Sequence, residues 1–319
     1  MLYNKIPNKI VDELGAAVVY HWWDMSSVPV QKSSNPIIPA IASLRAVNRQ
    51  VPIYVLDSSG FIKDWGGYPD KFDFYVIKWP FEISSHMALG DERNDMSLSI
   101  LLDVWRFAKE KLEQGLIVYC DCDTFWFEDG LPVDLMTPNH INVGADDGIV
   151  CFNKNDEKIE LFFDLFKAYS ITALHNEAFF NSIVGPKTRV MNSPVLCRKN
   201  IMNVIKKERP YLFNALPGRY VTGSQMASIS NPRFVHMDDM RMLSRGETLV
   251  LYQELYDNIE KADLMNEADW TDIYGAMRFQ KLQQWQISID NEIFRSMLAK
   301  RMDMKTCLSR AHKTVIRNV

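Results

Sequence analysis

Several common signatures are missing from this sequence. It has only five cysteines in 319 residues. None forms a C-x-x-C pair, so there is neither a disulfide framework nor a zinc site of standard spacing. No apolar run is long enough for a signal peptide or a membrane-spanning helix. We therefore expect a soluble protein of a reducing compartment, such as the cytoplasm.

An excess of positive charge is also lacking, because the formal net charge is −4, and a weakly acidic chain gives no global signature of nucleic-acid binding. The local exception is the end of the chain, where only Asp303 opposes a series of basic residues: Arg295, Lys300, Arg301, Lys305, Arg310, Lys313 and Arg317. This segment suits an ordinary solvated helix, an anionic membrane face or nucleic acid.

Strand and helix patterns alternate from about residue 16 to residue 183. The strands expected from apolar runs are 16–20, 51–56, 74–78 and 116–119. Helical spacing follows from residue 35 and again over 94–114, where Gly115 ends the pattern. This order predicts an α/β fold with a mixed, mostly parallel sheet flanked by helices, which binds ligands at the carboxyl ends of its strands.

The stretch LIVYCDCDTFWF places two carboxylates, Asp121 and Asp123, directly after a buried strand. Two unpaired carboxylates that close raise each other's pKa unless a cation lies between them. Oxygen ligands suit Mg²⁺ or Mn²⁺, and such ions are often shared with substrate phosphates, which indicates a nucleoside diphosphate. The alternative is that the two aspartates only cap a turn leaving the sheet.

Four motifs, in this order, resemble those of GT-A glycosyltransferases. The first is the D-x-D of residues 121–123. Residues 142–144 followed by 148–153 resemble a widened version of the family's N-x-G-h-h-h-F-N strand, and 175–181 resembles its D-Q-x-x-h-N helix start. Phe234, Val235 and His236 stand where many members bring a late histidine to the metal. The resemblance covers about residues 16–240.

The resemblance implies a donor site that holds Mn²⁺ or Mg²⁺ and a nucleoside diphosphate sugar, either a UDP- or a GDP-sugar. Asp123 would be the principal metal ligand, Asp121 would contact the metal or the ribose, and His236 would complete the set. A lone histidine beside apolar residues is otherwise a hydrogen-bonded structural residue. The acceptor would be a hydroxyl of a glycan, of a protein or of a modified DNA base.

Three carboxylates are candidates for the catalytic group. Glu177 matches the glutamine of the family's D-Q pair, although Asn176 replaces the aspartate. Asp146 and Asp147 lie in an insertion that would face the acceptor. The structural alternatives are a first-turn charge that complements the dipole of a helix for Glu177 and a surface turn for the aspartate pair.

A nucleotide pocket is expected at the ends of the first strands. Among Tyr20, His21 and Trp22, an aromatic ring could stack on the base, although core packing explains such residues equally well. Asp57 ends the second strand and could accept a bond from the base or ribose. Arg93 precedes the long helix and could reach a phosphate or begin a solvated face.

Two domains follow from this interpretation: a GT-A catalytic domain over 1–245 and a helical C-terminal extension over 246–319. Two other functions remain open. A haloacid dehalogenase-type phosphatase carries D-x-D-x-[TV] after a strand, but here Phe125 stands at the fifth position. A non-catalytic GT-A-like module would instead bind a partner through the basic extension.

Overall fold

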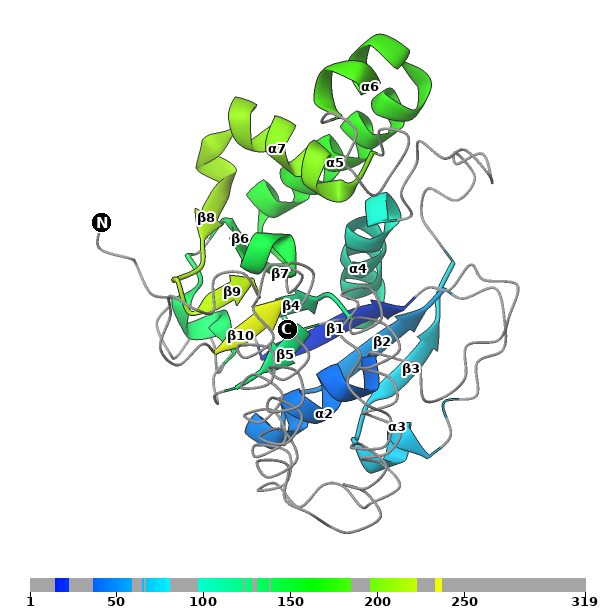
Figure 1. Ribbon diagram of the computed structural model, residues 1–319, viewed down its shortest axis with the longest axis vertical. Helices are drawn as coiled ribbons and strands as arrows, with labels where there is room; N and C mark the ends of the chain where they lie inside the picture. Colours follow the sequence, from blue (N-terminus) through cyan, green and yellow to red (C-terminus); the bar gives the residue numbers. More distant parts are fainter. Residues whose placement is uncertain are drawn as a thin grey trace, which may run out of the picture.

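The computed structural model describes residues 15–22, 37–58, 65, 67–80, 97–122, 124–127, 131–137, 139–184, 196–222 and 233–236 (Figure 1). The candidates Arg93 and Asp123 and the predicted extension 246–319 lie outside these residues. The side chain of Asp146 is likewise outside the described part.

A seven-stranded sheet in the order β3-β2-β1-β4-β7-β6-β8 forms the centre of the described chain. Only β7 runs antiparallel to the other strands of this sheet, since it is antiparallel to both β4 and β6. The strands are β1 Ala16–Trp22, β2 Ile53–Asp57, β3 Tyr75–Lys78, β4 Leu116–Cys120, β6 Ile141–Gly144, β7 Ile149–Asn153 and β8 Phe213–Ala215. The predicted mixed, mostly parallel sheet is therefore confirmed.

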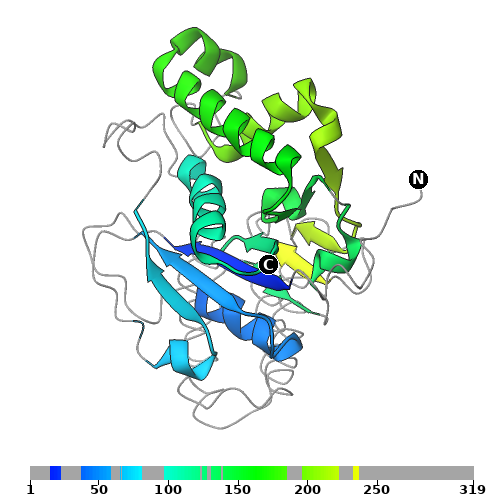
Figure 2. The same ribbon diagram turned by 180° about the vertical axis from the view of Figure 1, so that it is seen from behind.

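Helices cover both faces of this sheet, as Figures 1 and 2 show from opposite sides. One face carries α2, and the other carries α4, α5 and α7. The helices are α2 Ile37–Val47, α3 Tyr68–Lys71, α4 Ser97–Lys111, α5 Glu157–His175, α6 Glu177–Ile183 and α7 Arg198–Glu208. The side chain of Asp156 caps α5 by accepting from the backbone N–H of Lys158 (2.8 Å), and Asn176 caps α6 through Phe179 (2.9 Å).

The alternation of β4 explains why the sheet has two cores. Val118 and Cys120 face the core shared with α2, whereas Ile117 and Tyr119 face the core shared with α4 and α5. All residues of β4 are buried. A strand covered on both faces has a continuous apolar sequence. This explains why LIVYC contains no charged residue and why the first carboxylate, Asp121, comes directly after the strand.

A second, three-stranded sheet lies beside the end of β4. Its order is β5-β10-β9, with β5 Thr124–Trp126, β9 Tyr220–Thr222 and β10 Phe234–His236. The rings of Trp126 and Phe234 meet edge to face, with centroids 4.9 Å apart. Antiparallel pairing of β10 with β5 places His236 opposite Thr124, which brings a residue from far along the chain to the edge where Asp121 lies.

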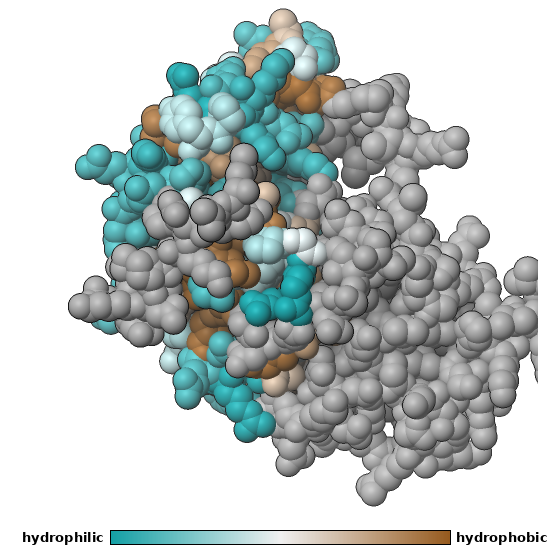
Figure 3. Space-filling view, turned by 90° about the vertical axis from the view of Figure 1, so that its left-hand side faces the viewer, coloured by the Kyte–Doolittle hydropathy of each residue, from teal (hydrophilic) through white to brown (hydrophobic). Residues whose placement is uncertain are grey.

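Short 3-10 helices complete the connections: η2 Pro132–Leu135, η3 Ala145–Asp147 and η4 Pro210–Leu212. On the face shown in Figure 3, hydrophilic residues cover much of the described surface. No helix within the described ranges is long and apolar enough to cross a membrane.

Packing of α5 against α4 predicts that alanine substitutions at two nearby residues of α5 differ greatly in their effect on stability. Phe163 is 1% exposed and stacks on Trp105 at 4.5 Å, whereas Leu161 is 42% exposed. We expect Phe163→Ala to lower the free energy of unfolding by about 3–5 kcal/mol because it opens a cavity. Leu161→Ala, the matched control, should change it by less than about 0.5 kcal/mol. Urea unfolding measures both, and equal losses would contradict this packing.

Candidate functional site

Asp121 begins the site, directly beyond the last residue of β4. Its backbone N–H donates to the carbonyl of Gly148 (3.0 Å), which extends the pairing of β4 with β7 by one residue. The hydroxyl of Thr124 donates to the carbonyl of Asp121 (2.7 Å). Both sides of this residue are therefore fixed, and its half-buried carboxylate, 16% exposed, projects at the carboxyl edge of the parallel strands.

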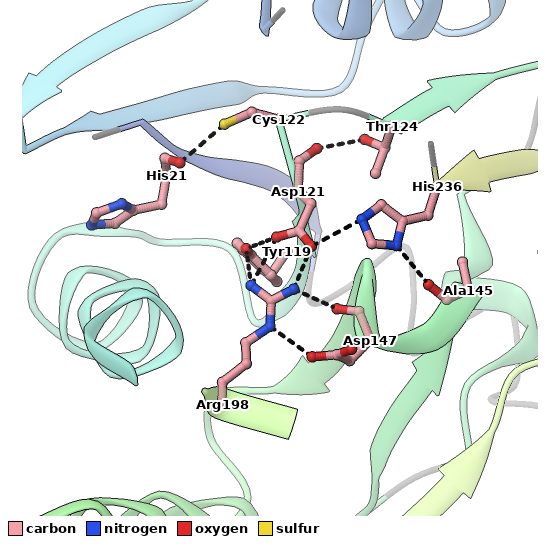
Figure 4. A network of polar contacts seen from close by, with 9 residues as sticks. All are labelled: His21, Tyr119, Asp121, Cys122, Thr124, Ala145, Asp147, Arg198 and His236. Carbon is pink, nitrogen blue, oxygen red and sulfur yellow. Dashed lines mark hydrogen bonds and ion pairs between the residues drawn. The ribbon is translucent and has the colours of Figure 1, made fainter. Parts of the chain in front are cut away.

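Arg198, the first residue of α7, reaches back to this carboxylate (Figure 4). Its Nη1 donates to Asp121 Oδ1 (2.8 Å) and its Nη2 to Oδ2, so the pair is bidentate. Nε donates to Asp147 Oδ2 (2.8 Å), and Nη2 also donates to the carbonyl of Asp147 (3.2 Å). Nη1 further donates to the hydroxyl of Tyr119 (2.7 Å). One guanidinium thus joins three residues from two strand ends.

Burial and charge oppose each other at Arg198. Removal from water lowers the pKa of this guanidinium, but the carboxylates of Asp121 and Asp147 raise it, and the net result lies well above its usual value. The guanidinium carbon also lies 5.2 Å from the ring centroid of Tyr119, within reach of a cation–π contact. Burial is the main cause that raises the pKa of Tyr119 well above its usual value. Arg198 is therefore a permanent cation, and the phenol beside it stays neutral.

Asp147 stands on η3, where the backbone is unusual. Ala145 and Asp147 both have positive φ angles, 50° and 65°, a region that costs a non-glycine residue on the order of 1–3 kcal/mol. With this backbone conformation, the carboxylate of Asp147 faces the guanidinium of Arg198. Burial raises the pKa of Asp147, and the guanidinium of Arg198 partly opposes that rise.

His236, at the end of β10, faces Asp121 from the other side. Its Nε2 lies 3.4 Å from Asp121 Oδ2, and its Nδ1 lies 3.1 Å from the carbonyl oxygen of Ala145. A carbonyl oxygen only accepts, so Nδ1 carries the proton. In the neutral imidazole, Nε2 then presents its lone pair toward the carboxylate, an arrangement that a proton or a cation would stabilise.

These residues fit a divalent metal in part. In metal sites the second ring nitrogen of a histidine ligand commonly donates to a backbone carbonyl, which fixes the tautomer, and Ala145 provides that carbonyl here. Asp121 and His236 are therefore suitable ligands. Within the part of the chain that the structure describes, no group of three or more histidine, cysteine or acidic residues could hold a metal. Asp123, the expected principal ligand, lies outside it.

Tyr20, His21 and Trp22 do not join this cluster. Tyr20 and Trp22 are 0% and 7% exposed and belong to the core shared with α2, which matches the alternative of core packing. His21 points to the opposite face, where its Nε2 lies 3.2 Å from a carboxylate oxygen of Asp103 and 3.2 Å from the Ser58 hydroxyl. These three side chains are therefore buried on the two faces of the sheet and do not form a surface on which a base could stack.

Asp57 lies at the carboxyl edge, as expected for the last residue of β2. Its Oδ2 accepts from Lys78 Nζ (2.8 Å) and from Trp65 Nε1 (3.2 Å), and the residue is 1% exposed. Lys78 and Trp65 therefore already donate to the carboxylate that would bind the base or ribose. That role of Asp57 stays a prediction.

Glu177 is not brought to the cluster. It is an exposed first-turn residue of α6, and this helix lies at the end of the molecule away from β10 in both Figure 1 and Figure 2. Its position agrees with the alternative, a charge that complements the dipole of the helix. Asp147 is the catalytic candidate that the structure does place beside Asp121.

A pocket of about 320 Å³ adjoins the cluster. Asp147 lines it from η3, and the exposed face of α7 forms much of another wall. Its polar and aromatic lining includes Lys199, Asn203, Lys206, Phe213 and Asn214. Asp147 therefore belongs both to the charged cluster and to a space that could hold a substrate.

Sequence reasoning missed Arg198. The residue is separated from Asp121 by 77 positions and carries no motif of its own. The available signal was indirect: a buried acidic pair needs a counter-charge, and a basic residue at the start of a helix that packs on the strand ends can supply it.

Comparison with solved structures identifies the fold. The chain matches the galactosyltransferase LgtC, solved in complex with donor and acceptor sugar analogs, at a TM-score of 0.50 and 11% identity, over 77% of this chain and 95% of that chain. The glycosyltransferase GlyE of Streptococcus pneumoniae matches at a TM-score of 0.48 and 14% identity, over 77% of this chain and 63% of that one. No protein-family model and no curated protein matches.

The chain therefore has the GT-A fold, as the sequence predicted. Identity this low shows the fold alone, so the chemistry has to be argued from the residues at its site.

Close approach between Gly148 and His236 gives a test of the site geometry. A Cβ added at Gly148 would lie 2.6 Å from His236 Nδ1 and 2.8 Å from its Cβ. We expect Gly148→Ala to displace the imidazole and to cost about 1–3 kcal/mol of unfolding free energy. Gly218→Ala is the control, since a Cβ there meets no atom within 4 Å. Urea unfolding and the imidazole NMR signals check this; unchanged His236 signals in Gly148→Ala would contradict it.

Proposed function

We propose that this protein is a glycosyltransferase that transfers a sugar from a UDP- or GDP-sugar to a hydroxyl acceptor with the aid of Mn²⁺ or Mg²⁺. The observation that carries the proposal is the convergence of Asp121, His236 and Asp147 at the carboxyl edge of a GT-A sheet. This edge is where open α/β sheets bind nucleotides.

The donor side of the site is formed by Asp121 and His236. A divalent ion bound by them would neutralise the negative charge that develops on the departing diphosphate. The Ala145 carbonyl keeps Nδ1 of His236 protonated, so Nε2, which lies 3.4 Å from Asp121 Oδ2, would be the ligand atom. Asp123 is the further ligand that the family resemblance proposes.

The acceptor side is formed by Asp147 and the adjoining pocket. In the transfer, the bond from the anomeric carbon to the diphosphate oxygen breaks, a bond to the acceptor oxygen forms, and the acceptor hydroxyl loses its proton. A buried carboxylate with a raised pKa, facing a pocket, is suited to take that proton. The polar lining from α7 would bind the hydroxyl groups of a sugar acceptor.

The phosphatase alternative is less compatible with these contacts. It needs Asp121 as a nucleophile, but both oxygens of this carboxylate accept hydrogen bonds from Arg198, which lowers its nucleophilicity. The non-catalytic alternative predicts nucleotide binding without turnover. Measurements of nucleotide binding and of released nucleotide therefore distinguish it from a glycosyltransferase.

Substitution at Asp121 tests the donor site. We expect purified protein with Mn²⁺ to hydrolyse at least one UDP- or GDP-sugar slowly, and Asp121→Asn to lower that rate by about 100-fold or more, because a metal ligand is lost. Asp164→Asn, an exposed carboxylate on α5, is the control. Released nucleotide is the readout across a panel of donors.

Two results would contradict this part of the proposal. Equal activity in EDTA would exclude the metal mechanism, and absence of turnover with every donor, alongside intact nucleotide binding, would favour the binding module.

Substitution at Asp147 tests the acceptor side. We expect Asp147→Asn to lower transfer by about 10²- to 10⁴-fold, the usual contribution of a general base, while nucleotide binding persists. Burial raises the pKa of Asp147, and a base acts when ionised. The wild-type transfer rate should therefore rise with pH through a step above the range of an exposed aspartate. A pH–rate profile in which Asp147→Asn keeps that step would contradict the assignment.

A further inference from the structure

Arg198 has a complete set of hydrogen-bond partners, which is unusual for a long cationic side chain. A guanidinium carries five N–H donors in a fixed fork. In this structure Nε donates to the Asp147 carboxylate, Nη1 to Asp121 and to Tyr119, and Nη2 to Asp121 and to the Asp147 carbonyl. Only 7% of the residue is exposed. The guanidinium group is thus a buried part of the site and not a surface side chain.

The carboxylate of Asp121 is nearly saturated in turn. Oδ1 accepts from Arg198 Nη1 and from the hydroxyl of Tyr119, which fills both of its lone pairs. Oδ2 accepts from Arg198 Nη2 and faces His236 Nε2 at 3.4 Å. The lone pairs that a metal would use on Asp121 are therefore mostly occupied by Arg198 and its neighbour Tyr119.

Charge makes the two occupants mutually exclusive at short range. A monovalent guanidinium and a divalent ion on the same half-buried carboxylate repel each other, and the repulsion is weakly screened away from bulk water. Conversely, when no metal is bound, Asp121 and Asp147 need a counter-cation, because buried carboxylates without a partner are costly.

We propose that Arg198 is an internal counter-cation that holds Asp121 and Asp147 in the metal-free protein and competes with a divalent metal for Asp121. Metal binding then requires the Arg198–Asp121 pair to open, and the released guanidinium is free to bind the diphosphate of the donor bidentately. Arg198 is in this sense a positioning residue that sets the metal affinity of the site.

The inference rests on the proposed function only through the metal site, so it is tested without nucleotide or acceptor. We expect Arg198→Gln to bind Mn²⁺ at least tenfold more tightly than the wild type, measured by calorimetry or by the EPR signal of free Mn²⁺. In EDTA the same variant should unfold at a lower temperature, and Mn²⁺ should raise its Tm by more than it raises that of the wild type. A merely structural arginine would lower stability without tightening metal binding.

Two further variants complete the design. Lys207→Gln removes the same charge from an exposed position on α7 and should leave Mn²⁺ affinity within twofold of the wild type. Arg198→Lys keeps the charge but loses the fork, so its Mn²⁺ affinity should fall between the wild type and Arg198→Gln; this variant decides the question if Arg198→Gln does not fold.

Equal or weaker Mn²⁺ binding by folded Arg198→Gln, or by Arg198→Lys in its place, would overturn the inference. So would a failure of both the wild type and the Arg198 variants to bind Mn²⁺. If Arg198→Gln binds Mn²⁺ more tightly but no donor sugar is hydrolysed, the competition stands and the proposed glycosyltransferase activity fails, so the two claims are separable.

Discussion

The ion pair between Arg198 and Asp121 is the contact on which the geometry of the site depends. Arg198 is buried and Asp121 half-buried, with 8% and 16% of their side chains exposed, and a buried pair that loses one partner leaves an uncompensated charge costing about 3–5 kcal/mol. The same guanidinium holds Asp147, so a single side chain fixes both carboxylates. Asp121 in turn faces His236, which links the pair to the second sheet.

The fold brings these residues together by three separate means. Parallel pairing of β1 with β4 runs to Cys120, so Asp121 follows directly at the carboxyl edge. Antiparallel pairing of β5 with β10 places His236 beside that edge, and the positive φ angles of η3 turn Asp147 toward it. The three meet at η3, because Ala145 is hydrogen-bonded to His236 and Gly148, which follows η3, is hydrogen-bonded to Asp121. The strained backbone of η3 is stabilised by the contacts that Arg198 makes.

Much of the fold was predictable from the sequence, because its strands and long helices carry strong local patterns. The predicted strands 16–20, 51–56 and 116–119 correspond to β1, β2 and β4, although β2 begins only at Ile53. The sequence indicates β4 because a fully buried strand is apolar throughout. The sequence also indicates both Asp121 and His236 as residues of the site. Their proximity could not follow from periodicity, because it depends on the pairing of β5 with β10, which is set by tertiary packing.

The remaining differences have physical reasons. Alternation along β1 decides that Tyr20 and Trp22 enter one core while His21 enters the other, and this depends on which faces the helices cover. Glu177 fits a motif by order, but its neighbour Asn176 caps α6, and the helix lies away from the cluster. Arg198 carries no motif at all, since its role arises only when α7 packs over the strand ends.

A double-mutant cycle in EDTA tests most directly whether the Arg198–Asp121 pair organises the site. The free energy of unfolding is measured for the wild type, Asp121→Asn, Arg198→Gln and the double variant. The account predicts strong coupling, of about 2 kcal/mol or more, because each single change leaves one member of the bidentate Arg198–Asp121 pair without the other, whereas the double change removes the pair as a unit. Loss of the Arg198–Asp147 contact is common to Arg198→Gln and the double variant, so it cancels in the cycle. Losses that add to within about 0.5 kcal/mol would show that the two side chains act independently, and would contradict the account.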